Sequence, residues 1–553
     1  MKKSFLKSVT AAALSATMVL SMVSCGSQEK NNQASTGVDS SVSVQEDRDL
    51  SFPLSEKKEF NFITWASSDS TQEPNERLIF KRLEEETNVH INWTCFVQDQ
   101  FADKKNLALA NANNLPDGLF NAEMTDYDLL RYAKQGVIIP VEDLIENYMP
   151  NLKKVLEENP EYEIMITAPD GHIYGFPWIE QLGAGKEAIQ SIGCMPFINK
   201  RWLDELNLDV PSTIDELTEA LRAFKENDMA GEGQTLPVSF IINGGNEDMG
   251  LLLGAFGEGY GDVADHIAVS NEKEIIYTAA MDGYKEGLKW MHQLQEEGLI
   301  DPEVYTHDWS TYVAKGKAGR YGLLFTWDCA NIVDNFEDYI PLPALTGPEG
   351  QKNIPRASRS DTSGLNRGRC VLTSNCKDTV LAAMWLDQMY APQQSAQNNW
   401  GTYGEEGTAN IFEMTEDGML KHLDLQGESP VEIRNSQCVA GPLAVMDSYY
   451  GDYVTCPDDA QYRLDWIKDV YVKDMNQDYV FPNVFMSQED LDLITQYTTD
   501  LDSYVKQMKS EFVMNGEIDE RWDEYLKKLE GYGLSKYKEI MQRNLDSYFE
   551  SAE

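Results

Sequence analysis

Apolar residues recur with two different spacings through the first quarter of the chain. Residues 59–65 and 90–96 have the composition of strands, whereas segments 76–87, 104–112 and 127–135 place their apolar residues on one helical face. A further short strand is predicted directly after a Leu-Pro-Asp turn at residues 115–117. Strands that alternate with helices predict a parallel sheet covered on both faces, and therefore an α/β fold.

The middle of the chain repeats this pattern with its own helix-start signals. Thr213 and Glu216 have the spacing of a capping box ahead of an amphipathic helix. Another helix is predicted over residues 282–298, and a strand over residues 320–326 delivers a Trp-Asp pair at its carboxyl end. Beyond residue 490 the spacing is mainly helical. Ligands of parallel sheets lie at the carboxyl ends of strands, so the loops there are the candidate binding loops.

The beginning of the sequence predicts where the protein works. Three lysines precede an apolar run at residues 9–23, which ends in small residues and Cys25. This pattern predicts a lipoprotein signal peptide at residues 1–24 and a diacylated Cys25 that holds the protein on the outer side of the cell membrane. Residues 25–56 are polar and predict a flexible tether. The alternative is an ordinary secretory signal in which Cys25 has no special role.

The composition of the chain limits the classes of binding partner. The 553 residues carry a net charge of −46, which disfavours nucleic acid and anionic lipid surfaces, and no second membrane segment is visible. Apart from Cys25 there are seven cysteines without a C-x-x-C pair or zinc spacing. Most are expected to be small buried hydrophobic residues, and a bridge between Cys370 and Cys376 stays open.

Enzymatic signatures are absent from the sequence. The six histidines are scattered without metal-ligand spacing, and there is no G-x-S-x-G elbow, P-loop, H-E-x-x-H motif or EF-hand loop. Pairs of carboxylates must occur by chance among 92 acidic residues, so they are not evidence for a glycosidase. We therefore expect no catalytic residues, no metal ligands and no cofactor. A structural Ca²⁺ stays open, because irregular oxygen cages leave little trace in a sequence.

Several tryptophans indicate carbohydrate. An aromatic face covers the C–H face of a sugar ring, while carboxylates and amides bind its hydroxyls. Four tryptophans stand beside strand ends or in glycine-rich loops, with Asp or Asn in or near the same loops: Trp65, Trp178, Trp327 and Trp400. For each of them, a place in the hydrophobic core is the alternative. Five others fall inside strands or helices and are expected in the core: Trp93, Trp202, Trp290, Trp385 and Trp466.

These residues resemble one known family, the bacterial extracellular solute-binding lipoproteins of family 1, which are the sugar-binding components of ABC importers. The similar segments are Leu-Pro-Asp at 115–117, DGHIYGFP at 170–177, FINKRWLDEL at 197–206 followed by PSTIDEL at 211–217, and the helical ending at 512–525. The resemblance covers nearly the whole chain after the tether. The tail departs from the family's frequent Ala-Tyr-Asp-Arg finish.

The resemblance implies two α/β lobes joined by a multi-segment hinge, with the ligand cleft between them. Residues 57–185 and 345–399 would form the first lobe, and residues 186–344 and 400–553 the second lobe with the C-terminal helices. The implied partners are a carbohydrate, as an oligosaccharide, and the permease subunits of an ABC transporter, and the protein is expected to be a monomer.

Candidate ligand-binding residues follow from matched positions and from the tryptophan environments. They are Trp65, Ser68, Asp69, Asn121, Glu123, Trp178, Asn246, Glu247, Trp327, Asp328, Trp400 and Tyr403. Three other functions remain open at this point: a peptide-binding importer component, a tethered glycoside hydrolase and an adhesive surface lipoprotein.

Overall fold

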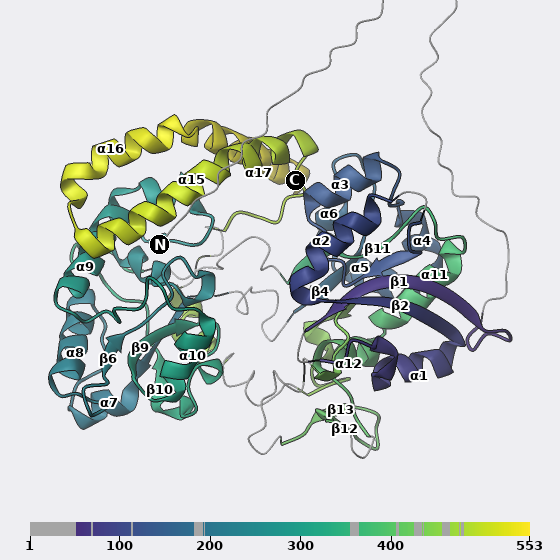
Figure 1. Cartoon of the computed structure of the whole chain (residues 1–553), viewed down its shortest axis with the longest axis horizontal. Coiled ribbons are helices and arrows are strands. Elements are labelled where there is room, and N and C mark those ends of the chain that lie inside the picture. Colours follow the sequence, from purple (N-terminus) through teal and green to yellow (C-terminus); the bar gives the residue numbers. More distant parts are fainter. Residues whose placement is uncertain are drawn as a thin grey trace, which may run out of the picture. The chain divides into compact units, whose positions relative to one another are not determined.

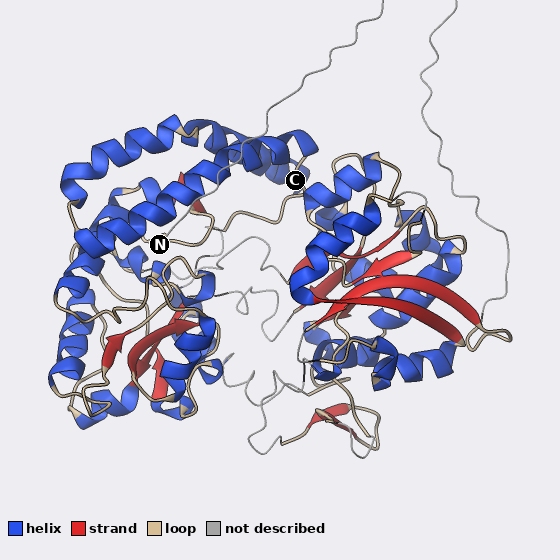
Figure 2. Cartoon of the chain, in the orientation of Figure 1, coloured by secondary structure: helices blue, strands red, loops and turns tan. Residues whose placement is uncertain are grey.

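The computed structural model describes residues 51–67, 70–111, 114–181, 192, 194–353, 364–404, 409–424, 434, 436–455, 465–474, 476 and 480–552. Within these residues the strands form one sheet of six strands, one sheet of four strands and two small hairpins. Helices surround both larger sheets (Figure 1, Figure 2). We call the part built on the six-stranded sheet the first lobe and the part built on the four-stranded sheet the second lobe.

In the first lobe the strand order is β14-β4-β11-β3-β1-β2. β1 is parallel to β2 and β3, β4 is parallel to β14, and β11 runs antiparallel to both β3 and β4. All strands except β11 therefore share one direction, and their carboxyl ends lie along one edge of the sheet. The strands are β1 (Lys58–Ala66), β2 (Val89–Val97), β3 (Gly118–Phe120), β4 (Phe176–Glu180), β11 (Leu365–Leu372) and β14 (Leu443–Val445).

Both faces of this sheet are buried. Phe60 and Phe62 of β1 belong to one core cluster, whereas Ile63 belongs to another. Successive side chains of a strand leave opposite faces, so each face must have its own cover. The first cluster includes residues of α1 (Leu78–Thr87), α4 (Glu142–Tyr148), α5 (Pro150–Glu158), α6 (Pro160–Ile166), α11 (Thr379–Asp387) and α12 (Pro392–Trp400), and the second includes residues of α2 (Gln98–Leu109) and α3 (Asp126–Lys134). The predicted two-sided α/β architecture is confirmed.

The second lobe has the strand order β10-β5-β9-β6. β6 is parallel to β9, while β5 is antiparallel to both β9 and β10. The predicted capping box is present: Thr213 accepts a hydrogen bond from the backbone N–H of Glu216, whose carboxylate accepts from Thr213 in return. The elements are β5 (Met195–Asn199), α7 (Lys200–Glu205), α8 (Ile214–Glu226), β6 (Leu236–Val238), α9 (Asp282–Glu296), α10 (Trp309–Lys317), β9 (Tyr321–Thr326) and β10 (Tyr339–Pro341).

Three C-terminal helices complete the core of the second lobe. Leu501, Phe512 and Leu529 share one core cluster with Leu288 of α9, and α15 packs directly on α9. α15 ends at Gly516, where φ is +73° and a Cβ atom would lie 2.5 Å from the imidazole of His292. Glycine is therefore required at this turn. The helices are α15 (Gln488–Asn515), α16 (Ile518–Gly531) and α17 (Leu534–Ala552), drawn from green to yellow in Figure 1.

The remaining elements are short. The hairpins are β7 (Ile267–Val269) with β8 (Ile275–Tyr277) and β12 (Phe412–Met414) with β13 (Leu420–His422). The 3-10 helices are η1 (Pro74–Glu76), η3 (Gly245–Glu247), η4 (Gly250–Ala255), η5 (Thr278–Ala280), η6 (Cys329–Asn331), η7 (Phe336–Asp338), η9 (Gln388–Tyr390), η10 (Asp447–Tyr449) and η11 (Val472–Asp474).

The structure divides the chain differently from the expected boundary at residue 400. β14 joins the first-lobe sheet beside β4, and Ile411 and Leu420 lie in the first-lobe core. The described residues between 401 and 455 that make these contacts thus pack with the first lobe instead of the second. The expectation differs from the structure there because β14, a strand of only three residues, pairs with β4 across more than 260 positions of sequence. So short a strand leaves no readable periodicity.

The expected boundary at residue 345 also shifts. The backbone N–H of Asn353 donates to Leu345 in the second lobe, and the first-lobe strand β11 begins at Leu365. The chain therefore passes to the first lobe between these positions.

The tryptophans expected in the core lie there. Trp202, Trp290 and Trp385 are buried, and Trp93 and Trp466 pack against the core clusters from partly buried positions. Six described cysteines are free thiols, including Cys370 and Cys376, so the bridge that the sequence left open is not formed. Among the described helices, none combines the length and the apolar content that a membrane span requires.

Candidate functional site

The first candidate surface is the carboxyl edge of the first-lobe sheet. Asn121 and Glu123 follow β3 with left-handed backbone angles, φ +54° and +48°. The side chain of Lys105 donates to the backbone carbonyl of Glu123 at 2.7 Å, which holds this turn. The turn therefore presents a buried amide and an exposed carboxylate beside each other.

Arg369 joins these two residues. It donates to Asn121 Oδ1 at 2.6 Å and pairs with the carboxylate of Glu123. Its guanidinium carbon lies 5.7 Å from the ring centre of Trp178 on the neighbouring strand β4. The Nε atom of Arg369 is buried without a hydrogen-bond partner among the described residues. The cluster thus combines an aromatic ring, an amide, a carboxylate and one unused donor.

Trp178 and Arg369 also line a pocket of about 580 Å³. Asn366 lines it from the first lobe, and Asp265, Asn483 and Tyr537 line it from the segments that accompany the second lobe. A volume of this size lies in the range of small-molecule sites. Its lining mixes aromatic, amide, guanidinium and carboxylate groups, which suits a ligand rich in hydroxyls.

Trp65 lies elsewhere. Its ring packs 6.5 Å from Phe101 of α2 in the core beneath β1, and its indole N–H has no partner among the described residues. It is not part of the pocket lining. Ser68 and Asp69, expected to bind ligand in the same loop, lie outside the described residues.

Trp400 and Tyr403 are each covered by an arginine. The guanidinium of Arg434 stacks 4.5 Å from the Trp400 ring centre, and that of Arg82 stacks 4.4 Å from the Tyr403 ring centre. Arg434 also donates to Asn399, whose amide donates to Glu180 Oε1 at 2.7 Å. One face of each ring is therefore covered by a guanidinium group and is not a bare aromatic surface.

The second candidate surface is the carboxyl edge of the second-lobe sheet. β6 and β9 are parallel, so the loop with Asn246 and Glu247 and the loop with Trp327 and Asp328 leave the same edge. The 3-10 turn η3, which contains Asn246 and Glu247, contacts β9. Asp328 caps η6 by accepting from the backbone N–H of Ala330 at 3.0 Å. The structure therefore brings these four predicted residues to one edge.

Glu247 is electrostatically unusual. Partial burial raises the pKa of its carboxyl to about 7, and no described cation pairs with it. Such a carboxyl is poised to accept or donate a hydrogen bond once a ligand arrives.

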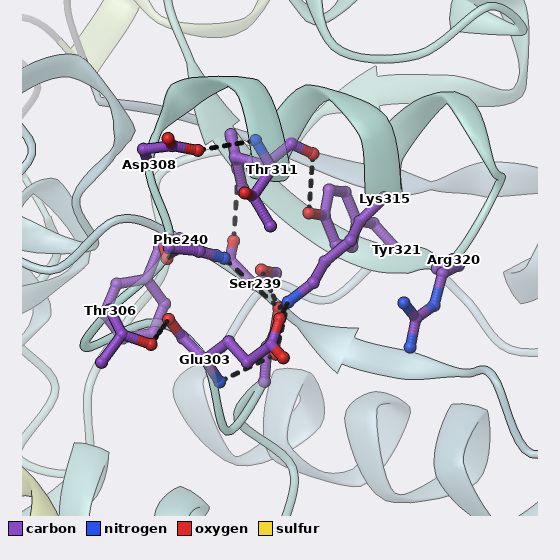
Figure 3. Close-up of polar contacts among 12 residues, drawn as sticks. Ser239, Phe240, Glu303, Thr306, Asp308, Thr311, Lys315, Arg320 and Tyr321 are labelled. Carbon is purple, nitrogen blue, oxygen red and sulfur yellow. Dashed lines mark hydrogen bonds and ion pairs between the residues drawn. The ribbon is translucent and has the colours of Figure 1, made fainter.

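A third polar cluster lies beneath α10 (Figure 3). Lys315 pairs with Asp301 at 2.7 Å and with Glu303 at 2.6 Å, and Asp301 accepts from the hydroxyl of Ser239. Its charged groups bind one another and tie α10 to the sheet. We assign this cluster to the scaffold.

Arginine is the residue type that the sequence reasoning missed. Arg367 and Arg369 stand in β11 on either side of Gly368, where the strand register shifts. Two arginines around a glycine inside an otherwise apolar strand were a readable signal of a bulge at a functional edge. Among the described residues, no group of three or more His, Cys, Asp or Glu side chains could hold a metal ion.

The sequence profile of the bacterial extracellular solute-binding proteins matches residues 67–396, more than half of the chain. The chain belongs to this family. The resemblance read from the sequence motifs is therefore confirmed. The family and its two-lobed α/β fold place the protein among the extracellular solute-binding components of transporters.

Two comparisons give the relation in detail. The chain is 50% identical over 502 residues to the fructooligosaccharide ABC transporter substrate-binding protein FusA of Streptococcus pneumoniae, covering 90% of this chain and 92% of FusA. A solved structure of FusA in complex with kestose has a TM-score of 0.83 and 49% identity, and covers 89% of this chain and 100% of the other.

A solute-binding protein from Bifidobacterium longum subsp. infantis, at 23% identity, has a TM-score of 0.76 and covers 89% of this chain and 98% of the other. At that identity the likeness concerns the fold alone.

Replacing Glu247 is expected to change stability in a pH-dependent way. The carboxyl titrates near 7 in the folded protein and near its ordinary 4.5 when unfolded, so the native state loses stability as pH rises from 4.5 through 7. Glu247→Gln removes this loss. At about pH 8 we expect the variant to melt roughly 1–3 °C higher than the unchanged protein, a modest rise because partial exposure screens the charge. At about pH 4 we expect little difference in melting temperature. Calorimetry at both pH values measures this, and an equal difference at both would contradict it.

Proposed function

We propose that this protein captures a fructo-oligosaccharide outside the cell and delivers it to the permease of an ABC importer. The observation that carries the proposal is the 50% identity with FusA over 90% of the chain. The comparison extends over both lobes, so it includes both candidate surfaces.

The chemistry of the two edges supports a sugar ligand. In the first lobe, Trp178 offers a partly buried ring beside the amide of Asn121 and the guanidinium of Arg369. In the second lobe, Trp327 stands at the same edge as Asn246 and Glu247. Each lobe thus offers an aromatic surface with neighbouring polar groups, which is what the C–H faces and hydroxyls of a sugar require.

Binding would proceed by closure of the lobes. An open protein offers a ligand only the contacts of one edge, and a sugar that touches both edges stabilises the closed state, so binding is a shift of a hinge equilibrium. A micromolar dissociation constant corresponds to about −8 kcal/mol. Ring stacking and several hydrogen bonds can supply this after the cost of ordering. No bond of the sugar is broken, so the protein acts as a binder and not as an enzyme.

We extend the proposal to the site and to the state of the protein. The ligand-contacting residues are Asn121, Glu123, Trp178 and Arg369 on the first lobe and Asn246, Glu247 and Trp327 on the second. The protein works as a monomer tethered through a lipid on Cys25. The relatives support the transporter partnership but leave these finer points to experiment.

Titration of the purified chain with kestose tests the function. We expect calorimetry to show one site per chain, and saturation at 100 times the dissociation constant to add about 2.7 kcal/mol of stability. Maltotriose and basic peptides serve as comparison ligands. Stabilisation by peptides alone would favour the peptide-importer function, release of fructose over time would favour a hydrolase, and no response to any ligand would reject a solute-capture role.

Tryptophan substitutions separate the site from the core. Trp178→Ala and Trp327→Ala are expected to weaken kestose binding by about tenfold or more, because each loses a ring face worth roughly 1.5 kcal/mol, while both remain stable. Trp385→Ala is the matched control. Its ring is 1% exposed, so its loss should cost about 3–5 kcal/mol of stability without directly altering the site. Wild-type affinity of Trp327→Ala would reject the second-lobe assignment.

Cys25→Ala tests the anchor. Without a lipidated cysteine the protein should appear in the culture medium instead of the membrane fraction, because a thioether-linked diacyl anchor no longer forms. Fractionation followed by immunoblotting measures this. Retention of the variant in the membrane would show that another device holds the protein.

A further inference from the structure

The second-lobe binding loop is attached to the C-terminal helix α15 through a buried lysine. Lys509 is 3% exposed, and its Nζ lies 2.8 Å from Asp248 Oδ2. Asp248 directly follows Glu247. We propose that Lys509 is a positioning residue, which orders residues 243–248 so that Asn246 and Glu247 meet the sugar. This inference rests on the proposed function.

Two further contacts connect the loop and the helix. Asp248 Oδ2 accepts a hydrogen bond from the backbone N–H of Asn243 at 2.5 Å, which closes the loop across its base. The side-chain amide of Asn243 donates to the backbone carbonyl of Lys506 at 3.3 Å. Both ends of the loop are therefore fastened to α15, one through an ion pair and one through an amide.

Backbone and sheet contacts hold one side of the loop. The backbone N–H of Ile241 donates to the carbonyl of Glu247, the thiol of Cys194 donates to the carbonyl of Gly245 at 2.8 Å, and η3 contacts β9. A cavity of about 50 Å³ lies against it, lined among others by Asn243, Gly245 and Asp248 from the loop side and by His266 and Lys509 from the opposite side. A Cβ atom on Gly245 would meet nothing within 4 Å. Close packing is what normally fixes a short loop, and on the side of Gly245 this loop borders space instead. The ion pair of Lys509 is thus the charged restraint on the side of the loop that borders the cavity.

The cavity is polar and has room for water. Asp248 Oδ1 and His266 Nε2 are buried without partners among the described residues, and both residues line the cavity. His266 is held on its other side, where Nδ1 lies 2.8 Å from Asp262 Oδ1. Water in such a space can satisfy the two free atoms, but it does not prevent the loop from moving. Removing the lysine charge would also leave the carboxylate of Asp248 buried without a compensating charge. Asp248 would lower this cost by moving outward toward water, and the loop would move with it.

The test compares three variants of the full chain, with kestose as the probe. Lys509→Met removes the charge and keeps the apolar stem. Asn243→Gly removes the amide tether, and glycine suits the left-handed φ of +59° at this position. Leu529→Ala in α16 is the control, because it loses a fully buried side chain of the same lobe that belongs to the core cluster and does not line the cavity.

We expect Lys509→Met to weaken kestose binding by about tenfold and Asn243→Gly by about threefold. Leu529→Ala should melt lower than the unchanged protein but bind kestose within about twofold of it. Amide hydrogen exchange of residues 243–248 should be faster in the first two variants and unchanged in the control. A role that is only structural would lower the melting temperature without this local change.

The outcomes separate the inference from the function. Unchanged affinity in folded Lys509→Met and Asn243→Gly overturns the inference while leaving kestose capture intact, and so does an equal loss of affinity in Leu529→Ala. If Lys509→Met does not fold, Asn243→Gly decides by the same two measurements. If the unchanged protein does not bind kestose, the proposed function fails and the inference fails with it.

Discussion

The shared direction of all strands except β11 in the first lobe and β5 in the second is the constraint on which the rest of the structure depends. Parallel strands are buried on both faces, so their polar connections can lie only beyond the strand ends. In the first lobe this brings the turn after β3 to the same edge as the end of β4, with β11 between the two strands, and in the second lobe it brings the loops after β6 and β9 together. Both candidate surfaces follow from that one condition, because the loops that leave the parallel strands gather at their carboxyl edge.

The carboxyl edge of the first-lobe sheet carries positive charge, although the chain as a whole is acidic. The net charge is −46, yet Arg367 and Arg369 occupy one bulge of β11. The two arginines make different contacts. Arg369 contacts Asn121 and Trp178, whereas Arg367 pairs with Asp126, donates to Asn483 and lies 4.6 Å over the ring of Phe485. One irregularity in β11 therefore carries both a candidate ligand contact and an attachment for the segment that leads into α15.

The sequence predicted the strands and helices whose stabilising contacts lie close together along the chain. β1 was expected at residues 59–65 and spans Lys58–Ala66, and the capping box at Thr213 is present because its two hydrogen bonds involve residues three apart. The sequence could not place β14, whose partner β4 is distant along the chain, or Arg369, whose role depends on neighbours from β3 and β4. Trp65 also has a long-range neighbour that the sequence does not show: its position at a strand end predicts a ligand contact, and Phe101 of α2 packs against its ring.

The buried charged groups of this binding site lower the stability of the lobe that carries them. Glu247 keeps a half-buried carboxyl without a cation, and Asp248 beside it is fully enclosed and depends on Lys509. A hydrophobic pair in place of Lys509 and Asp248 would commonly stabilise a protein as well or better. It would not fix the direction of the loop, because apolar contacts are not directional. A buried ion pair between a loop and a long helix is therefore best understood as a device for orientation, and the energy it costs is supplied by the large shared core of α9, α15 and α16.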